Sequence, residues 1–367
     1  MNILIATDYA SPYPGNFMES IKKLEEKVIE NGGKIVYTFP EKCKQIEWIV
    51  EFVKTREVYF HSKNIVKNIS EFKDIIKKYN VNILYSHFCI QHTQIALKVI
   101  SSINKKVKLV VHYHNHYEIS GNLIKKCISK YSLNGDLNIA CSASVAKSIP
   151  YKNVVTVENC INFSRLDKYE DIKIAGDNQI VILMFGFDYK RKGVDIAIRA
   201  LKDIAEKYDI ILAISVSVRL EELKQNIIND FGSIPGFVKF LEPRNDIATY
   251  YRASDIFLTP SREEGFCYAN IEAIYCKTMC IASDYMVDIY NTLISNSKKR
   301  SVSVPGIISF KNEDEKDLKK KVVKLIEEKS YNDLKIKDES KKLVTESCKI
   351  ENWVNKTYKE LESMSKG

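Results

Sequence analysis

One stretch of the chain decides the fold. It reads Pro260-Ser261-Arg262-Glu263-Glu264-Gly265-Phe266-Cys267-Tyr268-Ala269-Asn270-Ile271-Glu272-Ala273. The apolar run 255–259 before it is typical of a buried parallel strand, and residues 269–275 are typical of a helix. The stretch is therefore predicted to lie where a strand passes into a helix. In a doubly wound parallel sheet, ligands bind at such crossings, outside the carboxyl ends of the strands.

The crossing brings backbone amides and two carboxylates to one predicted ligand site. We expect the amides of Phe266, Cys267 and Tyr268 to begin the helix and to face a diphosphate, because the positive end of a helix dipole favours anions. Glu272 lies further into the helix, where a carboxylate accepts two hydrogen bonds from a ribose diol. Glu264 precedes the turn and is left beside a sugar.

The stretch resembles the E-x7-E signature of retaining GT-B glycosyltransferases of family four, the glycosyl transferases group 1. Pro-Ser before Glu264, Gly265-Phe266 after it and Ala273 after Glu272 make the match specific. The resemblance implies an α/β protein with the GT-B fold, in which two Rossmann-like domains have parallel sheets facing an interdomain cleft and a C-terminal helix crosses back to the first domain. The structural alternative is that Glu264 caps a helix and Glu272 is a solvated helix residue.

A second strand-to-helix crossing begins at Gly186, which permits close backbone approach to a ligand. After it, Lys192 is expected to place a cation against the diphosphate. The segment resembles the family's G-R-x4-K-G motif, except that Phe187 stands at the position of the arginine. Lys190 and Arg191 are the candidates to replace that cation, and Arg191 is included among the predicted donor-binding residues. The structural alternative is a lysine-rich surface turn.

The nucleotide base is expected near residues 240–243, where Leu241 is the predicted contact and most of the pocket is backbone. A base held mainly by backbone groups leaves the identity of the nucleotide and the sugar open. Gly265 completes the predicted donor-binding residues, as the glycine that turns the chain between Glu264 and the helix.

Histidines gather in the first half of the chain. Five of the six are His87, His92, His112, His114 and His116. In an extended segment the alternation along 112–116 points three imidazoles to one face, which would suit a metal. Only Glu118 adds a carboxylate, and the resemblance implies a metal-independent enzyme, so no metal and no cofactor besides the nucleotide sugar is expected. The resemblance implies instead that one histidine reaches the sugar, with His114 the best match and His112 next, while a structural role for each stays open.

The loop 11–17 corresponds to the family's glycine-rich loop and is predicted to contact the acceptor through Gly15 and Asn16. Relatives carry glycine where this chain has Asn16, and asparagine tolerates a positive φ. Cys160 and Lys277 also stand at positions where relatives have glycine.

Segments typical of strands and helices alternate along both halves, which favours parallel sheets with helices on both faces. The predicted strands are 2–7, 34–39, 83–85, 108–112, 138–141, 154–157, 180–185, 210–215, 238–241, 255–259 and 279–282. The charged segment 165–179 is interpreted as a linker between an acceptor-binding domain, 1–164, and a nucleotide-sugar-binding domain, 180–345. The amphipathic segment 346–367 is predicted to form the crossover helix.

The formal net charge is +9 and the pI is about 8.8, which favours anionic partners such as a nucleotide sugar or an anionic membrane face. Binding to nucleic acid is not expected, since no nucleic-acid motif accompanies the lysines. Segment 123–131 carries apolar residues opposite lysines and fits an interfacial helix, and it fits equally a core-packed helix with its lysines in water.

A cytoplasmic protein is expected. The first residues lack the basic region of a signal peptide, no run of about 18 apolar residues suggests a spanning helix, and the nine cysteines show no paired spacing.

The resemblance implies transfer of a hexosyl or N-acetylhexosaminyl group from a UDP- or GDP-linked sugar, with retention at the anomeric carbon. The acceptor would be a surface glycan, a lipid-linked saccharide or a protein, as in bacterial polysaccharide biosynthesis. Two alternatives stay open. One is a non-catalytic scaffold or acceptor-binding subunit, favoured by the departures at Asn16, Phe187, Cys160 and Lys277, and the other is a sugar-nucleotide epimerase of the same fold.

Overall fold

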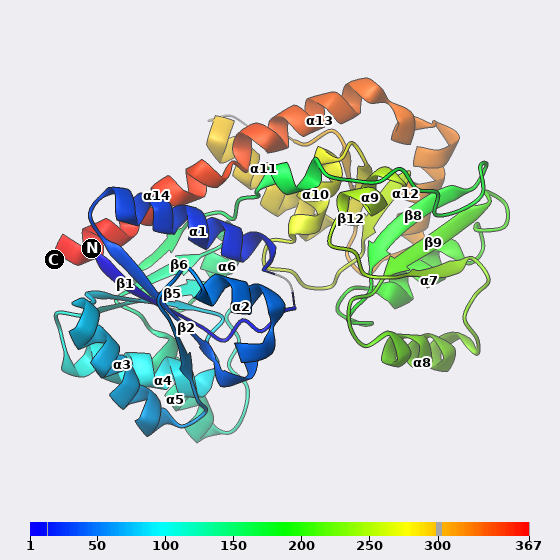
Figure 1. Cartoon of the computed structure of the whole chain (residues 1–367). Coiled ribbons are helices and arrows are strands. Elements are labelled where there is room, and N and C mark those ends of the chain that lie inside the picture. Colours follow the sequence, from blue (N-terminus) through cyan, green and yellow to red (C-terminus); the bar gives the residue numbers. More distant parts are fainter. Residues whose placement is uncertain (13, 299–302, 367) are drawn as a thin grey trace. The chain divides into compact units, whose positions relative to one another are not determined.

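The computed structural model describes residues 1–12, 14–298 and 303–366, so Tyr13 of the predicted acceptor loop and Gly367 of the predicted crossover segment lie outside the described residues. The chain forms two compact units (Figure 1). Unit 1 comprises Met1–Asn162 and Lys349–Gly367, and unit 2 comprises Phe163–Cys348.

Unit 1 is built on a seven-stranded parallel sheet in the order β3-β2-β1-β4-β5-β6-β7. The strands are β1 (Asn2–Thr7), β2 (Lys34–Pro40), β3 (Val58–His61), β4 (Ile83–His87), β5 (Lys108–Tyr113), β6 (Leu137–Ala140) and β7 (Val154–Thr156). The order reverses between β1 and β4, so the chain leaves these two adjacent strands in opposite directions. A crevice for ligands is expected at such a reversal.

Helices cover both faces of this sheet (Figure 1). They are α1 (Gly15–Glu30), α2 (Glu47–Val53), α3 (Ile65–Tyr79), α4 (Gln91–Ile103), α5 (Leu123–Leu133), α6 (Ala143–Ser148) and α14 (Ile350–Lys366). The last helix lies beside α1, and its Trp353 and Leu361 are buried in the same core as Ile3, Ile5 and Tyr85 of the sheet. The predicted return of the C-terminal helix to the first domain is confirmed.

Unit 2 contains a six-stranded parallel sheet in the order β10-β9-β8-β11-β12-β13. The strands are β8 (Ile180–Phe185), β9 (Ile210–Ser215), β10 (Val238–Leu241), β11 (Ile256–Thr259), β12 (Met279–Ser283) and β13 (Ile307–Phe310). The helices are α7 (Val194–Leu201), α8 (Leu220–Phe231), α9 (Ala248–Arg252), α10 (Tyr268–Tyr275), α11 (Asp284–Lys298), α12 (Glu315–Glu327) and α13 (Leu334–Ser347). Here the order reverses between β8 and β11. The predicted α/β fold with two Rossmann-like sheets is confirmed.

The segment 165–179 differs from the prediction. It was expected to link two domains, but it lies within unit 2. Its charged side chains make contacts inside that unit. Arg165 pairs with Glu272, and the Tyr275 hydroxyl donates to Asp167 at 2.8 Å. These partners all belong to unit 2, so the polar composition reflects attachment to that unit.

Within the described ranges, every helix is too short or too polar to cross a membrane.

Candidate active site

The two predicted donor loops meet at the reversal of strand order in unit 2. One loop follows β8 and carries Lys192, and the other follows β11 and carries Glu264. Since β8 and β11 are hydrogen-bonded neighbours, both loops leave the same edge of the sheet side by side. This is the position where a doubly wound sheet binds its ligand.

Lys192 and Glu264 form an ion pair between the two loops. Their side chains are only 10% and 11% exposed, so the pair is shielded from water on most sides. Nη1 of Arg191 lies 3.3 Å from the same carboxylate oxygen. Two cations therefore converge on Glu264, and they form a positive site that a diphosphate can use.

Phe187 replaces the arginine of the family motif, and the structure shows which cation lies closest to its ring. The ring lies 4.6 Å from Nζ of Lys192 and 5.1 Å from the guanidinium carbon of Arg191. Lys190, the other candidate replacement, instead pairs with Asp195 and Asp230, at 3.0 Å from each. Arg191 is thus the second cation beside Lys192, whereas Lys190 contacts two other carboxylates.

The two loops are locked together by their backbones. The amide of Arg262 donates to the carbonyl of Arg191 at 2.8 Å. Gly193 has a φ of +68°, and a Cβ atom there would lie 2.0 Å from the carbonyl oxygen of Pro260. Only glycine fits this close approach, so the position of Lys192 relative to Glu264 depends on it.

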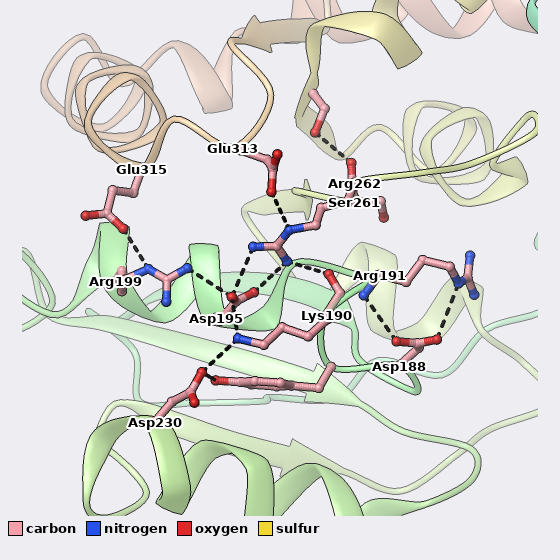
Figure 2. A network of polar contacts seen from close by, with 12 residues as sticks. Asp188, Lys190, Arg191, Asp195, Arg199, Asp230, Ser261, Arg262, Glu313 and Glu315 are labelled. Atoms are coloured by element: carbon pink, nitrogen blue, oxygen red, sulfur yellow. Dashed lines mark hydrogen bonds and ion pairs between the residues drawn. The ribbon is translucent and has the colours of Figure 1, made fainter.

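A buried carboxylate reinforces this junction (Figure 2). The side chain of Asp195, on α7, is 2% exposed and accepts from both terminal nitrogens of Arg262, at 2.8 and 3.0 Å. Lys190 and Arg199 donate to it as well, at 3.0 and 2.9 Å. Burial alone would raise the pKa of Asp195, but the hydrogen bonds from these cations overcome burial and lower the pKa to about 2. Arg262 lies in the stretch quoted from the sequence and Asp195 three residues after Lys192, yet no spacing signal revealed their pairing.

Glu272 is held inside unit 2. It is 5% exposed, pairs with Arg165, and accepts from the Tyr251 hydroxyl at 3.1 Å. The alternative that Glu272 is a solvated helix residue is therefore wrong. The alternative that Glu264 caps a helix is also wrong, because the N-cap of α10 is Cys267.

Comparisons with known proteins point to one family. Residues 167–343, which make up most of unit 2, match the model of the glycosyl transferases group 1. Unit 2 therefore resembles a group 1 glycosyltransferase domain. The chain is 23% identical over 304 residues to an uncharacterized glycosyltransferase of Methanocaldococcus jannaschii, covering 79% of this chain and 78% of that protein. It is 25% identical over 177 residues to an uncharacterized glycosyltransferase of Haemophilus influenzae, covering 48% of this chain and 50% of that protein.

Solved structures share the fold. A glycosyltransferase from Rickettsia africae has a TM-score of 0.76 at 18% identity, covering 99% of this chain and 98% of that one. Anabaena HepE in complex with UDP has a TM-score of 0.74 at 15% identity, covering 99% and 100%. Sucrose-phosphate synthase from Thermosynechococcus elongatus has a TM-score of 0.76 at 14% identity, covering 99% of each chain.

The start of α10 differs slightly from expectation. The helix begins at Tyr268, and Cys267 before it adopts a left-handed φ of +55°. Phe266 and Cys267 thus precede the helix and do not supply its first amides, because the left-handed residue breaks the helical path. The buried ring of Phe266 packs edge-on against Tyr268 and Tyr290 and anchors the turn at Gly265.

Gly186 and Leu241, two further residues predicted to bind the donor, belong to unit 2. A Cβ atom at Gly186 would lie 2.5 Å from a methyl carbon of Ile214, so packing between adjacent strands already requires glycine there. Leu241 ends β10 and is half-buried. Both lie at the edge of the sheet from which the Lys192 and Glu264 loops depart.

The predicted acceptor residues begin α1. Gly15 has a φ of +57°, while Asn16 lies inside the helix and is 6% exposed. Asn16 therefore keeps helical backbone geometry, and the expectation that it uses a positive φ is wrong, because α1 already begins at Gly15.

The histidines divide into two groups. β5 ends at Tyr113, so the expected alternation does not continue to His116, whose Nε2 lies 2.9 Å from Oγ of Ser144. His112 and His114 stack with ring centroids 4.4 Å apart, and they lie close to His87 of β4. Burial lowers the pKa of His112 to about 3 and holds the pKa of His114 well below its usual value. The closeness of His87 to these two histidines was not predicted, because it depends on the pairing of β4 with β5.

Proposed function

We propose that this chain is a glycosyltransferase that transfers a hexosyl or N-acetylhexosaminyl group from a UDP- or GDP-linked sugar with retention of anomeric configuration. The observation that carries the proposal is the convergence of Lys192 and Arg191 on Glu264 at the reversal of strand order. The transfer is proposed to need no metal, because two side-chain cations are placed to neutralise the diphosphate. Anabaena HepE, of similar fold, has been solved with UDP, which favours a uridine donor.

In the proposed reaction the bond between the anomeric carbon and the diphosphate oxygen breaks, and the bond from the acceptor oxygen to that carbon forms. Negative charge gathers on the leaving phosphate, where Lys192 and Arg191 stabilise it more in the transition state than in the ground state. The acceptor proton passes to the departing phosphate. Glu264 holds the sugar hydroxyls once the diphosphate has drawn the two cations away from its carboxylate.

Glu272 is proposed to anchor the ribose. To do so, it must exchange part of its contact with Arg165 for the ribose hydroxyls, and Tyr251 keeps the carboxylate in place meanwhile. His114 is proposed to contact the transferred sugar as a neutral imidazole, since burial keeps its pKa well below the usual value. Gly15 and Asn16 are proposed to contact a glycan, lipid-linked or protein acceptor.

The helix α5 favours a lipid-linked acceptor at an anionic membrane. Its apolar side chains Leu123, Ile124 and Tyr131 are 76%, 70% and 51% exposed, so the core-packed interpretation of this helix is wrong. Lysines lie among them, and this combination suits a helix at a membrane interface. We therefore propose that the cytoplasmic protein contacts the inner membrane face through α5.

A variant with Glu264 replaced by alanine tests the proposed chemistry. Transfer from the donor found by screening UDP and GDP sugars should fall by at least about a thousandfold, while the thermal midpoint of the variant stays within a few degrees of wild type. Near-normal turnover would contradict the role of Glu264. Conversion of the nucleotide sugar without any acceptor would identify an epimerase, and the lack of nucleotide affinity would identify a scaffold.

A further inference from the structure

Three histidines of unit 1, two of them buried and one half-buried, converge at the carboxyl edge of its sheet. We call His87, His112 and His114 the three-histidine cluster. His87 ends β4 and pairs in register with His112 of β5, and His114 follows one residue after that strand. One ring nitrogen from each lies within 4.8 Å of the others. The cluster is thus assembled by neighbouring strands, from positions that sequence spacing alone does not bring together.

Two ring nitrogens of the three-histidine cluster take no part in its hydrogen bonds. Nδ1 of His87 lies 3.0 Å from Nε2 of His114, and Nδ1 of His112 lies 2.8 Å from the Tyr85 hydroxyl. Nε2 of His87 and Nε2 of His112 are buried and have no hydrogen-bond partner in the described part of the chain. Buried polar atoms of native proteins nearly always have partners, so two such nitrogens in one cluster call for a ligand.

We propose that the cluster binds a divalent transition metal such as Zn²⁺. Imidazole is a preferred zinc ligand, and three histidines with one open position form a familiar tetrahedral set. A histidine ligand normally has its second nitrogen held by another group, and the Tyr85 hydroxyl holds His112 in this way. Each ring coordinates through one nitrogen and keeps its proton on the other, so binding releases no proton from the rings.

The surroundings fit an ion with an open coordination position. His112 and His114 line a cavity of about 190 Å³, which gives a fourth ligand such as water room to approach. Burial lowers the pKa of all three imidazoles, and neutral rings are the form that binds metals. The rings of His112 and His114 are nearly parallel, at 5°, so they must tilt toward a common point when the ion binds.

Metal binding carries a consequence for transfer that rests on the proposed role of His114. An ion that occupies Nε2 of His114 replaces the contact of this nitrogen with Nδ1 of His87 and withdraws the ring from the sugar, and transfer then falls. The ion thus inhibits transfer. Its site belongs to unit 1, whereas the proposed diphosphate site belongs to unit 2. Binding of the ion does not itself depend on this role.

Titration of the chelator-treated full chain with Co²⁺ tests the proposal. Wild type is expected to bind one ion with the intense visible absorption of tetrahedral cobalt. His112→Gln should weaken binding by at least about tenfold, and Tyr85→Phe, which keeps all three ligands, should weaken it less. His92→Gln, a half-buried histidine on α4 outside the cluster, is the matched control and should bind as wild type does.

Two results would overturn the metal site. The first is binding of less than one ion per chain by folded wild type, and the second is equal affinity in wild type and the His112 variant. Circular dichroism of each metal-free variant checks folding, and Tyr85→Phe serves if His112→Gln unfolds. Transfer is assayed separately without metal. Cobalt binding with no transfer would refute only the proposed function, and transfer unaffected by a bound ion would refute only the inhibition.

Discussion

Asp195 and Arg262 form a two-pronged ion pair that joins the first turn of α7 to the loop after β11. The two nitrogens of Arg262 lie 2.8 and 3.0 Å from the carboxylate oxygens, and the Asp195 side chain is almost fully buried. Arg262 stands two residues before Glu264, and Asp195 three residues after Lys192. The pair therefore holds Lys192 and Glu264, two residues proposed to bind the donor, at a fixed separation.

Asp195→Asn should loosen this junction. Removal of the charge leaves the half-buried Arg199 and Arg262 and the exposed Lys190 without their shared partner, so the free energy of unfolding should fall by about 2–4 kcal/mol. Misplacement of Lys192 relative to Glu264 should lower kcat/KM by about 10–100-fold. Asp230→Asn is the matched control, because Asp230 also pairs with Lys190 but is one-third exposed. Its unfolding free energy should change by less than about 1 kcal/mol, and equal losses in both variants would contradict the special role of Asp195.

The stability that Asp195 contributes should depend on pH. The pKa of its carboxyl is 3.8 in the unfolded chain and about 2 in the folded one. Because folding lowers this pKa, the contribution is fully present above pH 4 and is lost as the pH falls through 2. Denaturant unfolding of wild type and Asp195→Asn should therefore show a difference of about 2–3 kcal/mol near neutral pH that shrinks in acid. A difference that stays constant from pH 6 to pH 2 would show that the folded pKa is not lowered.

Arg191 should carry the role of the arginine in the family motif, which this chain replaces by Phe187. Arg191→Ala should lower kcat/KM by about 10–100-fold, since one cation is lost from the leaving phosphate. Phe187→Arg combined with Arg191→Ala should restore most of the activity. Lys190→Ala removes a cation from the same loop and should act mainly on stability, through Asp195. A smaller loss of kcat/KM in Arg191→Ala than in Lys190→Ala would reverse the assignment.

The exposed apolar face of α5 should bind anionic membranes. Replacement of Leu123 and Ile124 by serine should abolish cosedimentation with vesicles of anionic lipid, while wild type binds at low salt and dissociates as salt is raised. Val66→Ser on α3 is the control, since Val66 is 77% exposed but lies on a different helix. Equal sedimentation of the double variant and wild type would exclude α5 as the membrane contact.

Much of the fold could be predicted because unbroken apolar runs mark buried parallel strands. β8, β9 and β10 begin and end where the sequence predicts. β3 and β13, two four-residue strands at sheet edges, were not predicted, whereas β10, an edge strand of the same length, was. A short edge strand gains its structure from the strand beside it, and sequence periodicity does not record that partner.

The places of Lys192 and Glu264 were predictable, because each lies in a loop that follows a predicted strand. Contacts between residues of different segments were not predictable. The contact of Arg165 with Glu272 joins positions far apart in the chain, and the contact of Asp195 with Arg262 does the same. Such pairs depend on which strands are neighbours, and that order follows from packing of the whole sheet.

Titration calorimetry of UDP and GDP against wild type and Lys192→Ala tests the central claim most directly. If Lys192 and Arg191 form the diphosphate site, wild type binds at least one of the two nucleotides, and Lys192→Ala binds it at least about tenfold more weakly while remaining folded. Equal affinity in the two proteins, or no affinity of wild type for either nucleotide, would contradict the claim.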